Sequence, residues 1–178
     1  FEETYKTGIN QNYQISVSNA NDNTKYYIGA GYSDEKGVLP VAFNKRFNVK
    51  ANAESELYKW LTVGTNLAYS HYRNNGIISG TGSNRAGVVL SVLNTPTYAK
   101  PWSEIAGQEG WYWTQFYGAN LTTPAENLAR TENNYSQTDR MLLTGYAQIN
   151  FSKNFNFKST VSMDRRWTHS YSFLDPVK

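Results

Sequence analysis

Apolar and polar residues alternate most clearly in residues 141–163, MLLTGYAQINFSKNFNFKSTVSM. Odd positions carry mainly apolar side chains and even positions mainly polar ones, on both sides of the polar turn Ser152-Lys153-Asn154. Successive side chains of a β-strand point to opposite faces of the sheet, so this period of two indicates strands with one apolar face. Two such segments around a short turn predict an antiparallel hairpin.

The same alternation occurs in two earlier pairs of segments, which makes three predicted hairpins in all. We expect about six strands, near residues 10–19, 24–34, 43–55, 58–72, 140–152 and 155–167. Each has about 10–14 residues, whereas strands of water-soluble proteins usually have about five or six. Because about 9–11 residues cross the hydrocarbon of a bilayer, these lengths suit an all-β fold, an antiparallel transmembrane β-barrel segment.

The composition excludes several classes of site. The chain has 178 residues, which is enough for one ordinary domain. It contains no cysteine, and this excludes disulfides, thiolate metal sites and cysteine nucleophiles. The formal net charge of +3 is too small to indicate a nucleic-acid partner. Apolar stretches are far shorter than the roughly 20 residues of a membrane-spanning helix, but a β-barrel hides its lipid face in alternation.

The polar faces of the predicted strands carry charged residues, which would point into a water-filled lumen if the sheet crossed a membrane. These candidate lumen-facing residues are Arg46, Lys50, Glu54, Lys158 and Asp164. Aromatic residues collect near the strand ends, as in the two interfacial girdles of membrane barrels. The alternation also fits a soluble β-sandwich, whose aromatic residues pack between two sheets. The residues alone leave both folds open.

The connections between the predicted strands differ in length. Those near Asn21, Lys59 and Asn154 are short, whereas residues 34–42 and 73–139 form longer ones. In outer-membrane barrels the short turns face the periplasm and the long loops face the exterior. We therefore expect residues 73–139 to form an extracellular loop.

This long segment has features of its own. Apolar residues at positions 86, 89, 90 and 93 have the spacing of one short amphipathic helix. An aromatic cluster follows, and such rings contact sugars or protein partners through flat apolar faces and polar handles. Its candidate contact residues are Trp102, Trp111, Tyr112, Trp113, Phe116 and Tyr117. Alternatively, these rings pack the loop onto itself.

Catalytic and metal sites are poorly supported. His71 and His169 are the only histidines of the sequence, and each lies near a predicted strand end. The glycine-rich residues 80–87 lack both the third glycine of a dinucleotide motif and the lysine of a phosphate-binding loop. Calcium-loop and zinc-ligand spacings do not occur in the sequence. We expect no enzyme activity, no cofactor and no metal.

Several stretches, in order and over nearly the whole chain, resemble the SusC/RagA family of TonB-dependent outer-membrane transporters of Bacteroidetes. They are YQISVS (13–18), NTKYY (23–27), GYSDEKGV (31–38), FNKRFNV (43–49), WLTVGTNL (60–67), LNTP (93–96) and residues 124–128 with 140–164, which match a further hairpin. Asn23 departs from the pattern, because a charged residue is frequent there. Each motif alone is weak, whereas their order is fairly specific.

The resemblance implies a barrel of 22 strands with an N-terminal plug, energised through the TonB complex and capped by a SusD-like surface lipoprotein that helps to capture glycans or peptides. Residues 1–178 would then be an internal part of one barrel domain, with about six strands and one long extracellular loop. Six strands cannot close a barrel, so we expect neighbouring strands to pair with their open edges. The plug, the TonB box and the signal sequence are expected in other parts of the protein.

The function implied by this resemblance is active nutrient import across the bacterial outer membrane, with the aromatic loop against the nutrient or the lipoprotein lid. Two other classes of function stay open. A soluble or surface β-sandwich module could bind carbohydrate with the same aromatic residues. A passive porin-like barrel would differ from the transporter in that its uptake would not depend on TonB.

Overall fold

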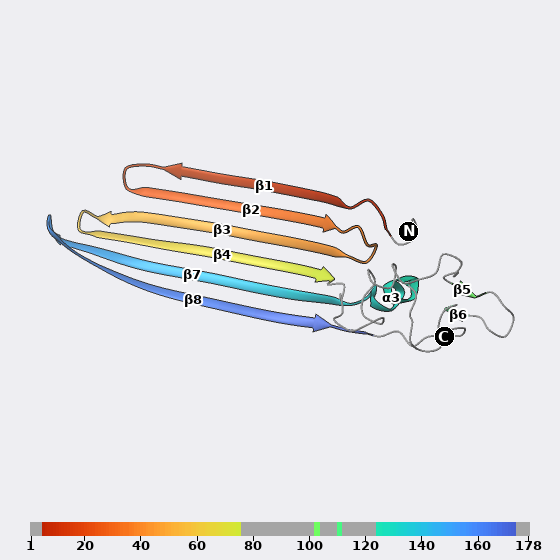
Figure 1. Ribbon diagram of the computed structural model, residues 1–178. Coiled ribbons are helices and arrows are strands. Elements are labelled where there is room, and N and C mark those ends of the chain that lie inside the picture. Colours follow the sequence, from red (N-terminus) through yellow and green to blue (C-terminus); the bar gives the residue numbers. More distant parts are fainter. Residues whose placement is uncertain (1–4, 76–101, 104–109, 112–123, 174–178) are drawn as a thin grey trace.

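Six long strands form one antiparallel sheet in the computed structural model, which describes residues 5–75, 102–103, 110–111 and 124–173 (Figure 1). They are β1 (Ile9–Ala20), β2 (Thr24–Lys36), β3 (Phe43–Tyr58), β4 (Leu61–Asn75), β7 (Tyr135–Ser152) and β8 (Phe155–Tyr171). Their order in the sheet is β1-β2-β3-β4-β7-β8, so each strand lies beside its neighbours in sequence. The predicted all-β architecture of about six antiparallel strands is confirmed.

The three short turns lie at one end of the sheet, and the longer connections lie at the other (Figure 1). We call these the short-turn end and the long-connection end. In the turn between β1 and β2, the side-chain oxygen of Asn21 accepts hydrogen bonds from the backbone N–H groups of Asn23 (3.1 Å) and Thr24 (2.6 Å). Asparagine favours turns because it can bond to the backbone in this way. The other two short turns each adjoin an irregularity in register, near Tyr58 and near Ser152.

β7 and β8 extend furthest beyond the bounds that alternation suggests. β7 begins at Tyr135 rather than near 140, and β8 continues to Tyr171 rather than ending near 167. In this extension the rings of Tyr135 and Tyr171 stack with centroids 5.5 Å apart, and the hydroxyls of Ser136 and Ser170 lie 3.2 Å apart. One face of the extension carries aromatic and polar residues and the other carries serine and threonine, so apolar alternation does not mark the extension.

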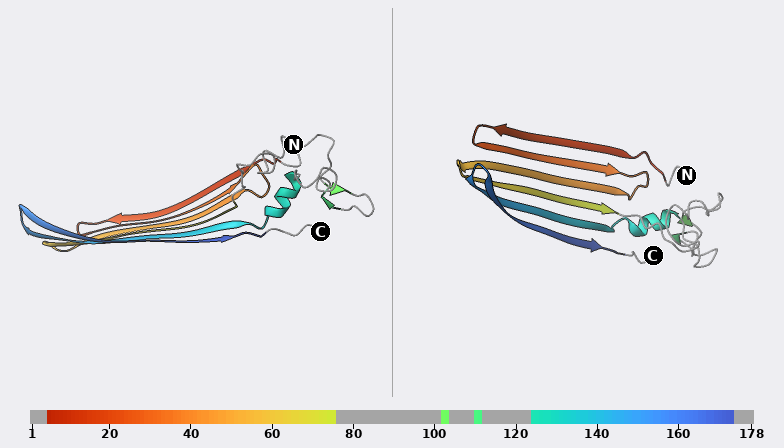
Figure 2. Two further views of the ribbon diagram at one scale, coloured as in Figure 1. Left: turned by 60° about the horizontal axis from the view of Figure 1, so that its bottom comes forward. Right: turned by 60° about the vertical axis from the view of Figure 1, so that its left-hand side comes forward.

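The described part of the chain has only a small apolar core, at the long-connection end. Leu39 and Leu128 are its buried apolar side chains, and Tyr5 and Val41 pack against them. Leu128 belongs to the helix α3 (Pro124–Thr131), which thereby contacts the connection between β2 and β3. The sheet itself is curved (Figure 2), and this core lies beyond its long-connection end.

The connection between β4 and β7 also contains the short strands β5 (Trp102–Ser103) and β6 (Gly110–Trp111). The helix expected over residues 86–93 lies outside the described residues. The helix α3 corrects the expectation that residues 124–128 are part of a hairpin, and the sequence Thr123-Pro124-Ala125-Glu126 has the residue types of a helix start. No helix in the described ranges is long and apolar enough to cross a bilayer.

Candidate functional site

The strand register sorts the residues of the sheet into an apolar face and a polar face. One row of directly opposed residues crosses all six strands and is apolar throughout: Val17, Ile28, Ala51, Leu67, Leu143 and Met163. The adjacent row, which points to the other face, is polar throughout: Ser18, Tyr27, Asn52, Asn66, Thr144 and Ser162. The period of two in the sequence therefore continues from strand to strand as two chemically distinct surfaces.

The apolar face is uncovered. Ile15 and Val161 are 71 % and 74 % exposed, and Ile28 and Phe157 are each 54 % exposed. Within the ranges that the structure describes, the six strands form a single layer with no second sheet packed on it. A β-sandwich would bury these side chains between two sheets.

Aromatic residues lie at both ends of this apolar face. At the long-connection end one row contains Tyr13, Tyr32, Phe47 and Trp167, together with His71 and Asp139. At the short-turn end the Tyr58 and Trp60 rings stack with centroids 5.5 Å apart, and those of Phe151 and Phe155 are 5.7 Å apart.

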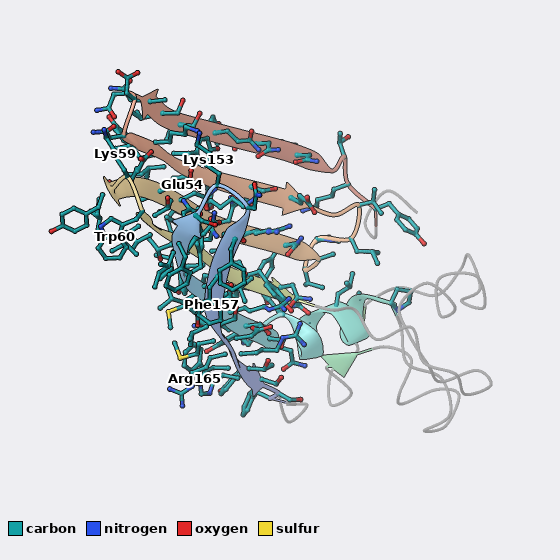
Figure 3. The ribbon with its side chains drawn as sticks, turned by 90° about the vertical axis from the view of Figure 1, so that its left-hand side faces the viewer. Glu54, Lys59, Trp60, Lys153, Phe157 and Arg165 are labelled. Atoms are coloured by element: carbon teal, nitrogen blue, oxygen red, sulfur yellow. The ribbon has the colours of Figure 1, made fainter. Side chains whose placement is uncertain are left out.

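The two aromatic levels are separated by about the thickness of a membrane. Phe155 and Trp167 are twelve residues apart on β8, a rise of about 40 Å at about 3.3 Å per residue. A strand tilt of about 45° reduces this to about 28 Å, close to the apolar band of about 25 Å on membrane barrels. Trp60 and Arg165 project from the same side of the sheet (Figure 3), and the Arg165 guanidinium carbon lies 5.4 Å from the centre of the Trp167 ring.

The charged side chains that the described strands carry on the apolar face lie towards the long-connection end. Asp139 accepts a hydrogen bond from the Tyr69 hydroxyl (2.7 Å), and its same oxygen lies 2.7 Å from Nδ1 of His71. Lys45 pairs with Asp34 at 3.9 Å. In the described part of the molecule no group of three or more His, Asp or Glu residues could hold a metal ion.

The five predicted lumen-facing residues share the polar face. Lys50 and Asp164 lie in one row of directly opposed residues, although they belong to β3 and β8. Arg46 and Glu54 are each four residues from Lys50 on the same strand, and Lys158 is six residues from Asp164. Even separations along a strand keep side chains on the same face.

One group of these residues is held together near the short-turn end. The Tyr146 hydroxyl on β7 donates a hydrogen bond to Glu54 on β3, across the strand β4. The ammonium group of Lys158 lies 4.0 Å from the centre of the Tyr146 ring, in a cation–π contact. Gly64 lies beneath the ring, and a Cβ atom there would collide with it. This group joins β3, β4, β7 and β8.

A second group lies towards the long-connection end and is rich in arginine. Arg140 holds Asp164 in a bidentate ion pair, with Nε–Oδ1 at 3.1 Å and Nη2–Oδ2 at 2.6 Å. Arg166 is directly opposite Arg140, and Arg46 lies on β3. All three arginines line a hollow of about 910 Å³ on the polar face.

Sequence reasoning missed Arg140, Arg166 and Tyr146 as members of these groups. The positions of Arg140 and Arg166 could have been predicted, because the turn at residues 153–154 sets the register of β7 with β8. That register places Arg140 opposite Arg166 and diagonal to Asp164. The partnership of Tyr146 with Glu54 was not readable in this way, because it crosses an intervening strand.

The aromatic candidates of the long connection are placed only in part. Trp102 and Trp111 are directly opposed in the two-stranded sheet of β5 and β6. Tyr112, Trp113, Phe116 and Tyr117 lie outside the described residues. The backbone pairing brings two of the six candidates together.

The chain is similar in sequence to parts of two TonB-dependent receptors. No family model matches the chain. It is 28 % identical over 161 residues to TonB-dependent receptor P3 of Formosa agariphila and 22 % identical over 160 residues to TonB-dependent receptor P39 of the same organism. Each match covers 89 % of this chain, which spans 16 % and 14 % of the length of the two relatives.

Two solved structures also resemble the chain in fold. A chain of the RagAB peptide importer in the "closed-closed" state matches with a TM-score of 0.71 and 26 % identity, over 94 % of this chain and 18 % of that one. A structure of the RagAB peptide transporter matches with a TM-score of 0.68 and 25 % identity, over the same shares. These matches confirm the resemblance that the sequence motifs predicted: in sequence and in fold, the chain is similar to part of the barrel of SusC/RagA-like TonB-dependent transporters.

Proposed function

We propose that this chain is a section of the barrel wall of a TonB-dependent transporter that imports nutrients across a bacterial outer membrane. The observation that carries the proposal is the two-faced sheet. An uncovered apolar belt between two aromatic levels lies on one side, and a charged polar surface lies on the other. The similarity to a chain of the RagAB peptide importer supports the same assignment.

The apolar face requires an apolar neighbour. Burying one large apolar side chain is worth about 1.5–3 kcal/mol, so a row that crosses six strands would be very costly in water. Lipid tails satisfy this need over a belt of about 28 Å, whereas a soluble partner would not require aromatic residues at both borders. We infer that the apolar face contacts lipid.

The polar face then lines the interior of the barrel. Arg46, Lys50, Glu54, Lys158 and Asp164 would contact water, substrate or a plug domain there. The strands β1 and β8 form the two edges of the described sheet. In the whole transporter, further strands would pair with these edges and close the barrel.

The unequal connections give the orientation. The short-turn end would face the periplasm, and the long-connection end would face the exterior. Residues 73–139 would then lie outside the cell, where Trp102, Trp111, Tyr112, Trp113, Phe116 and Tyr117 could contact a SusD-like surface lipoprotein or the substrate. The name of the RagAB importer supports peptides as substrates, and oligosaccharides are the alternative.

The test uses cells that produce the full-length transporter, with and without a functional TonB. We expect uptake of labelled peptides or oligosaccharides that is lost when TonB is removed. Uptake that continues unchanged without TonB would indicate a passive porin-like barrel. A full-length protein that stays in aqueous solution without detergent would instead support the β-sandwich alternative.

A further inference from the structure

We propose that the arginine group at the long-connection end of the polar face binds carboxylate groups of the imported molecule, so that the transporter prefers acidic substrates. The proposal rests on the proposed function, because it takes the polar face as the substrate path. The group consists of Arg46 on β3, Arg140 on β7 and Arg166 on β8.

The register brings these three arginines to one region. Arg140 is directly opposite Arg166 and Ser70, while Arg46 is directly opposite Tyr72 in the next row. Neighbouring strands are about 4.8 Å apart, so Arg46 and Arg166, with β4 and β7 between them, are separated by about 14 Å across the sheet and by two residues, about 7 Å, along it. A ligand that lies over β4 and β7 can contact both side chains.

Positive charge exceeds negative charge in this region. Asp164 is already held by both nitrogens of Arg140 in the bidentate pair. Glu35, which lines the same hollow, accepts a hydrogen bond from the Asn44 side chain at 3.2 Å. Within the described ranges, Arg46 and Arg166 make no ion pair, so two guanidinium groups stay available to an incoming anion.

Arg140 and Arg166 repel each other, and a bound anion would reduce this repulsion. Like charges directly opposite each other on neighbouring strands destabilise a sheet, and Arg140 faces Arg166 in this way. Asp164 compensates the charge of Arg140. The ion pair of these two residues is about half exposed, with 49 % of the Arg140 side chain and 46 % of the Asp164 side chain accessible. A second carboxylate between Arg46 and Arg166 would offset one of the two remaining positive charges.

The surrounding surface suits a carboxylate ligand. The hollow of about 910 Å³ is also lined by Ser70, Tyr72 and Asn74, which add hydroxyl and amide donors. Arginine presents a planar fork of N–H donors that matches a carboxylate in two parallel hydrogen bonds. The hollow lies towards the end that would face the exterior, where a substrate enters first.

Carboxylates can come from acidic peptides or from uronic acid oligosaccharides, and the experiment includes both. Purified full-length transporter in detergent is titrated with an aspartate-rich peptide and its asparagine counterpart, and with an oligogalacturonate and its neutral methyl ester. The variants are Arg46→Gln/Arg166→Gln and a control, Lys25→Gln/Lys153→Gln. The control removes the same charge from the short-turn end of the sheet, where Lys25 lies on β2 and Lys153 lies in the turn between β7 and β8.

We expect at least one acidic probe to bind the wild type more tightly than its neutral counterpart. The arginine variant should lose about tenfold or more in affinity for that probe, because hydrogen bonds between charged groups are the strong ones. The neutral counterpart and the control variant should change less than about twofold. Arg46→Lys/Arg166→Lys, which keeps the charge without the fork, should lie between these results.

Equal affinity of the wild type for acidic and neutral probes, or equal losses of both in the arginine variant, would overturn the proposal. Equal losses would indicate that the arginines hold an acidic part of the protein, such as the plug. The amount of folded barrel, read from heat-modified gel mobility, separates misfolding from lost binding. TonB-dependent uptake of neutral probes without acidic preference would reject the arginine site and leave the proposed function standing.

Discussion

The Tyr146 hydroxyl of β7 reaches Glu54 of β3 by passing over Gly64 of the intervening strand β4. A single tyrosine thus connects strands that are not neighbours in the sheet. The contact requires a residue without a side chain beneath the ring, which explains glycine at position 64. It also orients Glu54 and Lys158 on the polar face.

Gly64→Ala should therefore destabilise the barrel by about 1–3 kcal/mol, because the added Cβ forces the Tyr146 ring from its position. The measurement is urea unfolding of the full-length transporter in lipid vesicles, followed by tryptophan fluorescence. Gly145→Ala is the matched control, because a Cβ there meets nothing within 4 Å. Equal effects of the two substitutions would show that the ring does not depend on Gly64.

The ion pair between Arg140 and Asp164 should contribute little to stability. Both side chains are about half exposed, and exposed pairs contribute little because water screens the two charges. In a double-mutant cycle with Arg140→Ala and Asp164→Ala in the same unfolding assay, the effects of the two substitutions should be additive. A clear departure from additivity would mean that this part of the polar face is shielded from water in the whole transporter.

Loss of the Asp139 side chain should destabilise the sheet locally more than loss of the Asp34 side chain. Asp139→Ala removes the acceptor for Tyr69 and His71 together, and we expect a loss of about 1–3 kcal/mol. Hydrogen exchange of the β4–β7 pair should then become faster around residues 69–71. Asp34→Ala, which breaks only the 3.9 Å contact with Lys45, is the control and should leave exchange nearly unchanged.

The aromatic loop gives a prediction about partners. Trp111→Ala with Trp113→Ala in the full transporter should weaken uptake or association with the SusD-like lipoprotein, because aromatic anchors dominate such contacts. Pull-down of the lipoprotein and uptake of labelled substrate measure the two effects. Unchanged values of both would assign these rings to packing within the loop.

The six strands were predictable because alternation reports directly on a sheet with two different faces. Val17 and Ser18 are neighbours in sequence and belong to two opposite rows, one apolar and one polar across the sheet. The same alternation of positions along each strand predicted which charged residues lie on the polar face. Even the aromatic levels could be expected, since they coincide with strand ends.

Other features could not be read from alternation. The first residues of β7 are polar on both faces apart from Tyr135, so the start of the strand at Tyr135 leaves no periodic signal of apolar residues. The contact of Tyr146 with Glu54 depends on the register of three strands. The helix α3 offered only its starting residues, in a segment too short for clear periodicity.

Contact of the apolar face with lipid is tested most directly by spin labels placed one at a time from residue 157 to 167 in the full-length transporter, reconstituted in bilayers. Labels at Phe157, Val161 and Met163 should be relaxed by dissolved oxygen and protected from a water-soluble nickel chelate. Labels at Thr160 and Ser162 should show the reverse or be packed against protein. Oxygen accessibility without a period of two, or access of the nickel chelate to Val161, would contradict the assignment of this face to the membrane.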